Sequence, residues 1–256
     1  MDEEQTCLSN ISQKLFDIEP FQIMFAFLVG VANRAYMARG EFMQLHLADS
    51  ELNNAITTLR HDTRFIRDTL VSSDYHRALL EKLETFPVLK MKRGAEGCQV
   101  CLTDWEPASA VQLSGEPYKA EEGFKLAEDD ERGKKRRSFS TSCRSASTKW
   151  AKFTICASCE DRVVSFHAFS HWKYNLFCAI VDRIHWLETT FGDDSVDRST
   201  LPTSTDDDEE IIEWLCSEGE GTFDEQWRVF TDMLRSAKDL ADYRSFGNDA
   251  VRDSED

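Results

Sequence analysis

The sequence predicts a mainly α-helical α+β domain with a small β element that carries a zinc knuckle. Apolar residues recur at helical spacing over most of the chain. Alternation of apolar and polar residues, which is typical of strands, is confined to short segments such as 88–93 and 110–113. These segments lie near two cysteine pairs with C-x-x-C spacing. A chain of 256 residues with 41% hydrophobic residues is long enough to bury such a core.

Three helices are expected before the β element. Pro20 suits the first turn of a helix, and the apolar residues of 20–37 predict a helix that is buried on most sides. Residues 49–70 repeat apolar side chains near the helical period and predict a second helix. Ser73 is a candidate N-cap for a third helix over 73–87, which a proline ends.

The whole chain is expected to consist of one domain with an insertion, a linker and a tail. The zinc-knuckle helical domain covers 14–190 and ends with a long, aromatic-rich helix after the second cysteine pair. It is interrupted at 127–149 by a charged, Ser-rich insertion that we expect to be disordered. An acidic linker follows at 191–210, and an acidic tail with an amphipathic helix occupies 211–256.

Four cysteines form two pairs, Cys98 with Cys101 and Cys156 with Cys159. Structural zinc takes four thiolate or imidazole ligands in a tetrahedron. Two residues between cysteines let both thiolates of one turn face the same ion, and a second turn completes the shell. We therefore predict one structural zinc ion held by these four cysteines. Ordinary buried cysteines or a redox pair are the alternatives.

Two histidines of the long helix are alternative zinc ligands. His167 and His171 are one helical turn apart, which is a spacing that metal sites use. Cys159 and His167 are separated by about 12 Å of rise on a straight helix, which is too far for one shared ion. Packing and hydrogen bonding beside the apolar face is therefore the favoured interpretation of both histidines.

A basic run lies within the predicted insertion. It consists of Arg132, Lys134, Lys135, Arg136 and Arg137. Clustered basic residues in a disordered segment can be recognised for nuclear import or can contact the phosphates of a nucleic acid. A solvated loop without a partner is the alternative.

The tail contains an apolar stripe on one face of a helix that begins at about Thr222. Its members are Phe223, Trp227, Phe230 and Leu234. An isolated helix of this length is not stable in water, so the stripe must be buried. Either it packs on the chain's own helical body, which we favour because the linker can fold back, or it docks on an unidentified protein partner.

Composition and missing motifs argue against several classes of function. The net charge of −17 disfavours a chain that clamps DNA by charge alone. The Gly-rich motifs of nucleotide-binding folds, the G-x-S-x-G elbow and the H-E-x-x-H motif do not occur. The acidic N-terminus does not resemble a signal peptide, and the longest uncharged apolar run, 20–33, is too short to span a bilayer. We expect a soluble protein without membrane contact.

Several segments together resemble one protein family. They are Leu70-Val-Ser-Ser-Asp-Tyr75 with Phe86-Pro87, the first cysteine pair, Leu113-Ser-Gly-Glu-Pro-Tyr118, Cys159-x-x-Arg162 and His167-x-x-x-His171-Trp-Lys-Tyr174. Over about residues 20–190 this set resembles domain of unknown function 4211, which is found in fungal proteins and in the animal coiled-coil domain-containing protein 82. The resemblance implies a nuclear protein with no assigned enzymatic activity.

The resemblance also bears on individual residues. Cys98, Cys101, Cys159, Arg162, His167 and His171 fall on family positions, whereas the family usually has glycine in place of Cys156. If relatives bind a metal without this cysteine, one of the two histidines would have to complete the shell.

The sequence thus leads to three hypotheses about function. The first is a non-catalytic nuclear interaction module that is stabilised by a structural zinc ion and binds an unidentified protein. The second is a nucleic-acid-binding zinc module that uses the basic run 132–137. The third and least favoured is an enzyme in which Cys98 or Cys159 pairs with His167, because knuckle spacing suits a ligand better than a nucleophile.

Overall fold

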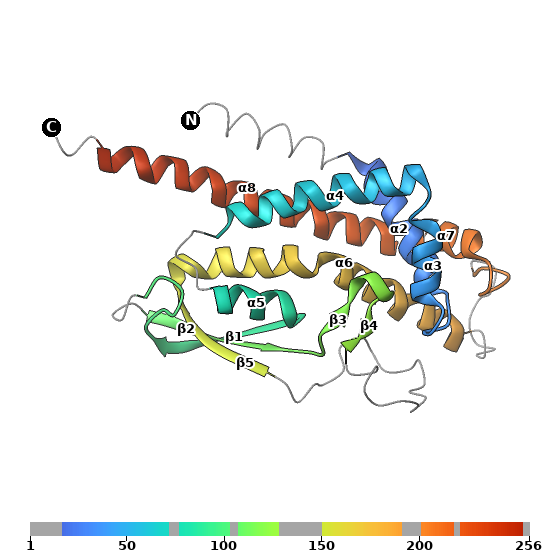
Figure 1. The fold of residues 1–256 in the computed structure, drawn as a ribbon, viewed down its shortest axis with the longest axis horizontal. Coiled ribbons are helices and arrows are strands. Elements are labelled where there is room, and N and C mark those ends of the chain that lie inside the picture. Colours follow the sequence, from blue (N-terminus) through green and yellow to red (C-terminus); the bar gives the residue numbers. More distant parts are fainter. Residues whose placement is uncertain are drawn as a thin grey trace.

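The structure is a computed structural model of the chain. It describes residues 17–71, 77–102, 107–127, 150–190, 201–217 and 221–252. It is mainly helical with a small antiparallel sheet, which confirms the predicted fold class (Figure 1). The predicted insertion beyond residue 127, including the basic run 132–137, lies outside the described residues, as do residues 191–200 of the predicted linker. None of the described helices combines the length and apolarity that a membrane span requires.

The helices that precede the sheet are α2 (Ile18–Ala32), α3 (Arg39–His46), α4 (Ser50–Thr69) and α5 (Arg77–Thr85). Aspartates cap two of them. The carboxylate of Asp17 accepts a hydrogen bond from the amide of Glu19, and that of Asp49 accepts from the amides of Glu51 and Leu52. These bonds satisfy amides that have no partner inside the helix, which explains where α2 and α4 begin.

The first helix is shorter than predicted, because α2 ends at Ala32 and not near Met37. Beyond this point the side chains of Asn33 and Arg34 donate hydrogen bonds to the carboxylate of Asp208, at 2.7 to 3.0 Å. Asp208 is the first residue of α7 (Asp208–Ser217), so this polar contact joins the end of the first helix to the tail of the chain.

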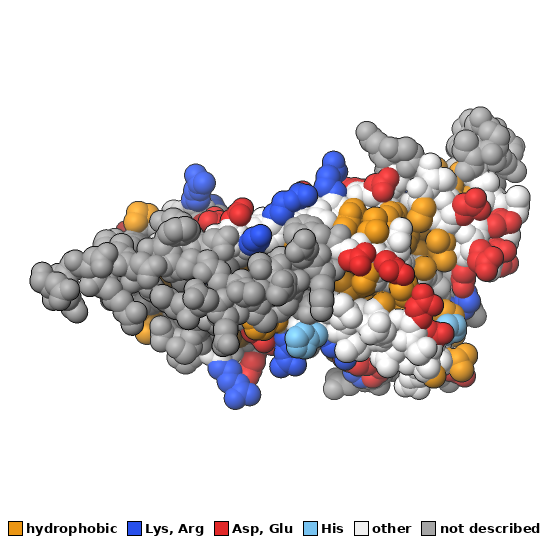
Figure 2. Space-filling view, turned by 90° about the horizontal axis from the view of Figure 1, so that it is seen from above, with side chains coloured by type: hydrophobic (Ala, Val, Ile, Leu, Met, Phe, Trp, Pro, Cys, Tyr) orange, Lys and Arg blue, Asp and Glu red, His pale blue; other side chains and the backbone are white. Residues whose placement is uncertain are grey.

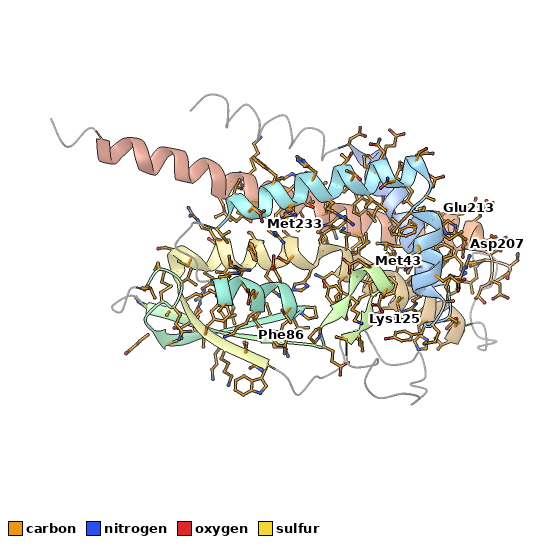
Figure 3. All side chains as sticks on the ribbon, in the orientation of Figure 1. Met43, Phe86, Lys125, Asp207, Glu213 and Met233 are labelled. Carbon is orange, nitrogen blue, oxygen red and sulfur yellow. The ribbon has the colours of Figure 1, made fainter. Side chains whose placement is uncertain are left out.

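The acidic residues at the end of the predicted linker begin a helix instead. The carboxylate of Asp207 accepts hydrogen bonds from the amides of Glu209 and Glu210 and so caps α7. Acidic side chains in a first turn are also favoured by the helix dipole. The labelled Asp207 and Glu213 lie at the end of the molecule far from the sheet (Figure 3). The helix then buries Ile211, Trp214 and Leu215.

The main sheet contains β1 (Val88–Glu96), β2 (Pro107–Ser114) and β5 (Trp150–Cys156), antiparallel and in the order β1-β2-β5. A two-stranded ribbon of β3 (Tyr118–Lys119) and β4 (Lys125–Leu126) flanks the 3-10 turn η1 (Ala120–Glu122). Alternation along β2 buries Val111 and Leu113 and exposes Ala110 and Gln112. Figure 1 shows helices on one side of this sheet only.

The long helix α6 (Ala157–Thr190) connects two cores. Its buried residues up to Phe166 belong to the core beside the sheet and α5, and those from Phe169 onward belong to the core that it forms with α2, α4 and α8 (Thr222–Arg252). Aromatic and aliphatic residues are spread around α6 and are not confined to one stripe, as expected for a helix that is buried on several sides.

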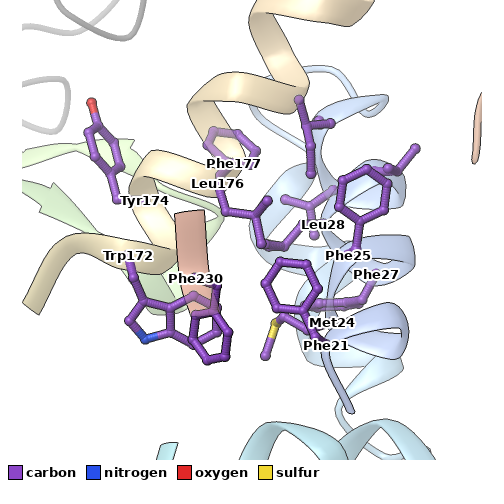
Figure 4. Close-up of a cluster of buried hydrophobic side chains, with 14 of the residues drawn as sticks. Phe21, Met24, Phe25, Phe27, Leu28, Trp172, Tyr174, Leu176, Phe177 and Phe230 are labelled. Atoms are coloured by element: carbon purple, nitrogen blue, oxygen red, sulfur yellow. The ribbon is translucent and has the colours of Figure 1, made fainter. Parts of the chain in front are cut away.

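Aromatic rings from three helices fill the larger core (Figure 4). The ring of Phe21 on α2 lies 5.8 Å from Phe223, 5.1 Å from Trp227 and 5.1 Å from Phe230, measured between centroids. Trp172 on α6 lies 4.9 Å from Phe230. These separations are typical of favourable aromatic pairs, which add to the free energy of apolar burial.

The apolar stripe of α8 therefore packs on the chain's own body, which was the favoured alternative. Phe223, Phe230 and Leu234 are buried, and Trp227 is half-buried. The stripe is part of the hydrophobic core, so these four residues do not form a free docking surface for a partner.

Truncation of one stripe residue tests this arrangement. We expect Phe230→Ala to lower the free energy of unfolding by about 3–5 kcal/mol, because it removes a buried ring and leaves a cavity. The matched control is the neighbouring Val229→Ala, since Val229 is 56% exposed and its truncation should change stability by about 0.5 kcal/mol or less. Urea denaturation measures both. Equal effects of the two substitutions would contradict the packing of α8 on the body.

Candidate metal centre

The two cysteine pairs meet at one end of the sheet. Cys98 and Cys101 lie in the turn that follows β1, whereas Cys156 ends β5 and Cys159 lies in the first turn of α6. In the strand register, Cys156 is opposite Ala108 near the start of β2. The antiparallel pairing of the three strands therefore brings the turn before β2 next to the junction of β5 and α6.

All four sulfur atoms converge, as predicted. They lie within 4.8 Å of one another, and the Sγ atoms of Cys101 and Cys156 are 3.6 Å apart. Zinc–sulfur bonds of about 2.3 Å in a tetrahedron place sulfurs about 3.8 Å from one another. The four cysteines are free thiols. The cluster thus has the donor type, the number and the spacing that can hold one soft metal ion.

The first knuckle has Leu102, and not glycine, after its second cysteine. The amide of Cys101 points at the sulfur of Cys98, with a nitrogen–sulfur distance of 3.5 Å. Leu102 then adopts a left-handed conformation with φ of 60°, which is unusual for a residue with a branched side chain. A knuckle can therefore form on this sequence at the cost of local backbone strain.

Two polar contacts fix the knuckles relative to the sheet. The amide of Gln99 donates to the carbonyl of Thr154 at 2.9 Å, and the amide of Thr154 donates to Oε1 of Gln99 at 3.3 Å. The hydroxyl of Ser109 on β2 donates to the carboxylate of Glu160 on α6 at 2.9 Å. The first contact joins the turn after β1 to β5, and the second joins β2 to the start of α6.

Burial makes the thiols poor nucleophiles. Loss of solvation raises the pKa of Cys156 to about 11, and it raises the pKa of Cys159 still further, with the neighbouring thiols adding to the effect. Because the thiolate is the reactive form, raised pKa values suit a structural role better than a catalytic one. A metal ion bound here would have to displace these protons.

The two candidate histidines bind backbone carbonyl groups. Nε2 of His167 donates to the carbonyl of Phe86 at 2.9 Å, and Nε2 of His171 donates to the carbonyl of Leu83 at 2.8 Å. The hydroxyl of Tyr118 donates to Nδ1 of His171 at 2.8 Å. Both rings thus join α6 to the end of α5 and to the chain entering β1, and neither belongs to the sulfur cluster.

Burial keeps the histidines neutral, although the hydrogen bonds to the carbonyl groups of Phe86 and Leu83 oppose this effect. Burial lowers the pKa of His171 to about 3, and the neighbouring His167 contributes to this shift. Burial also lowers the pKa of His167 itself. In the unfolded chain both rings would titrate near their ordinary value of about 6.5. Below that pH only the unfolded state takes up the protons. The stability that the two buried histidines provide is therefore fully present above about pH 6.5 and decreases as the pH falls.

His171 should therefore account for part of the acid sensitivity. Between pH 6.5 and pH 5 its protonation in the unfolded state should cost about 1.7 kcal/mol of stability. The loss of stability over this range should be smaller by about that amount in His171→Gln. The exposed Gln44, which has no titrating side chain, is the control as Gln44→Ala and should leave the pH dependence unchanged. Urea denaturation at fixed zinc concentration measures both, and identical slopes in the two variants would refute the assignment.

A basic groove was not singled out by the sequence analysis. It has a volume of about 370 Å³ and lies between α4, α5 and α6. Burial lowers the pKa of Lys173 in its wall to about 8, and the nearby Arg60 adds to the shift. The facing Glu84 is paired with Arg67 at 2.8 Å. Only the tertiary fold assembles these residues, because they are far apart in sequence.

No family model, curated protein or solved structure matches this chain. The resemblance to domain of unknown function 4211 therefore rests on the sequence motifs. The structure brings several of these motifs together: Tyr118 of one binds His171 of another, and His167 binds Phe86 of a third.

Proposed function

We propose that this chain is a non-catalytic interaction module of the nucleus, stabilised by one structural zinc ion. The observation that carries the zinc assignment is the convergence of four sulfur atoms within 4.8 Å. Zinc is the common metal of four-cysteine sites, and a shell of four cysteines leaves no open position for a substrate.

The ion would act as a cross-link between segments that are distant in sequence. Cys98 and Cys101 belong to the turn of the β1–β2 hairpin, and Cys156 and Cys159 belong to the β5–α6 junction. A small three-stranded sheet with helices on one face has limited apolar burial of its own. Free energy of metal binding at such a site adds directly to the stability of the fold.

Metal analysis tests the zinc assignment. Native mass spectrometry should find one zinc ion per chain in the wild-type protein. The double variant Cys98→Ser, Cys101→Ser should lose the ion and unfold at a lower urea concentration. Cys216→Ser is the control, because Cys216 is exposed and lies outside the cluster. Full zinc content in the double variant would overturn the proposal, whereas retention only in Cys156→Ser would point to a histidine-containing shell.

The nuclear part of the proposal rests on the family resemblance and on the basic run. Runs of this composition are recognised by nuclear import receptors. The family has no assigned enzymatic activity, which agrees with an interaction module.

Microscopy of a fusion protein tests the localisation. The chain should be fused to two copies of a fluorescent protein, so that passive diffusion into the nucleus is slow. We expect nuclear fluorescence for the wild type and cytoplasmic fluorescence when Lys134, Lys135, Arg136 and Arg137 are changed to alanine. A control with Arg77, Lys82 and Lys238 changed to alanine removes exposed charges elsewhere and should remain nuclear. Nuclear fluorescence of the first variant would show that the run is not the signal.

A further inference from the structure

The main sheet has one face that no described helix covers. Helices α5 and α6 lie on the opposite side (Figure 1). The register places Lys90, Gln112 and Lys152 in one row across the three strands, and Lys92, Ala110 and Thr154 in the next row. Residues in one row of a sheet share a face. Because Gln112 is exposed whereas the alternating Val111 and Leu113 are buried, both rows belong to the open face.

This face carries positive charge although the chain as a whole is acidic. Lys90, Lys92 and Lys152 are all exposed on it, and β2 between them has no charged residue. Across the three strands the one acidic residue is Glu96, at the end of β1. Acidic side chains gather instead at the end of the molecule formed by α7 (Figure 2). Charges that are separated by more than the Debye length, about 8 Å at physiological salt, are largely screened from one another.

An exposed tryptophan stands at the edge of the same face. Trp150 is 56% exposed and is opposite Ser114 in the register, in the row next to Gln112 and Lys152. The ammonium of Lys152 lies 4.6 Å from the centre of its ring. A large aromatic ring in water contributes little to folding, but a ring beside lysines on a flat sheet is a platform for stacking.

We propose that this open face binds single-stranded nucleic acid. A base would stack on Trp150, and the backbone phosphates would contact Lys90, Lys92 and Lys152. The amide of Gln112 offers hydrogen-bonding groups to base edges between the lysines. The inference names the partner of the proposed interaction module, but it depends neither on the identity of the metal nor on the nuclear location.

The combination of residues favours a single strand over other acidic partners. An acidic peptide would satisfy the lysines but has no base to cover Trp150. A duplex holds its bases stacked within the helix and presents mainly phosphates. Alternate residues on a strand are about 7 Å apart, and neighbouring strands are about 5 Å apart, so the lysines can follow the backbone of an extended strand.

Fluorescence anisotropy with labelled 12-nucleotide oligo-dT and oligo-U tests the proposal on the full chain at 50 and 150 mM KCl. Changing Lys90, Lys92 and Lys152 to glutamine should weaken binding at least 10-fold and reduce the slope of log K against log salt by about 2. Trp150→Ala should weaken binding about 10-fold, whereas Trp150→Phe should retain most of the affinity because it keeps a stacking ring. A charge-matched control changes Arg77, Lys82 and Lys238 to glutamine and should bind like the wild type.

Several results would overturn the proposal. These are no binding at 50 mM KCl, equal weakening in the charge-matched control, and equal affinity for a 12-base-pair duplex or for polyglutamate. Binding that survives the sheet variants but disappears when the basic run 132–137 is neutralised would also overturn it. Circular dichroism and zinc content should be unchanged in the sheet variants. Failure to bind with the metal in place therefore refutes this inference and leaves the zinc assignment standing.

Discussion

The fold depends on the burial of one 34-residue helix on several of its sides. Because α6 is apolar around much of its circumference, it must be covered along its length by the sheet, α5, α2, α4 and α8. Two cores that could otherwise be separate domains thus share one rigid element. Because Cys159 lies in the first turn of this helix, the candidate metal centre lies at the start of the same element.

Buried polar contacts determine how the sheet side is placed on this helix. Apolar packing alone would allow α5 and β1 to slide along α6, since hydrophobic contact has little directional preference. His167 and His171 bind two carbonyl groups near the α5–β1 junction and so fix the register. Burial of these two histidines makes the stability of the fold sensitive to acid, because each ring must stay neutral to remain buried. His167 and His171, whose spacing in the sequence is that of metal ligands, therefore stabilise the fold.

Patterns that depend on local spacing were predictable from the sequence, and patterns that depend on distant partners were not. Helix α4 begins at its Asp49 cap, and the four sulfurs meet as the C-x-x-C spacing indicates. Helix α2 ends earlier than predicted, and Arg34 beyond its end binds Asp208, a distant contact that no local pattern reveals. The basic groove beside Lys173 was missed for the same reason, since three helices have to pack before it exists.

Total charge does not describe individual surfaces, because it averages over parts of the molecule that the fold separates. The acidic segment that resembled a linker places its carboxylates at the start of α7, where the helix dipole and Arg34 stabilise them. The lysines of β1 and β5 are far apart in sequence and become neighbours only through the register of the sheet. A chain with a net charge of −17 can therefore present a positive face to an anionic partner. Strand register, and not composition, determines which charges share that face.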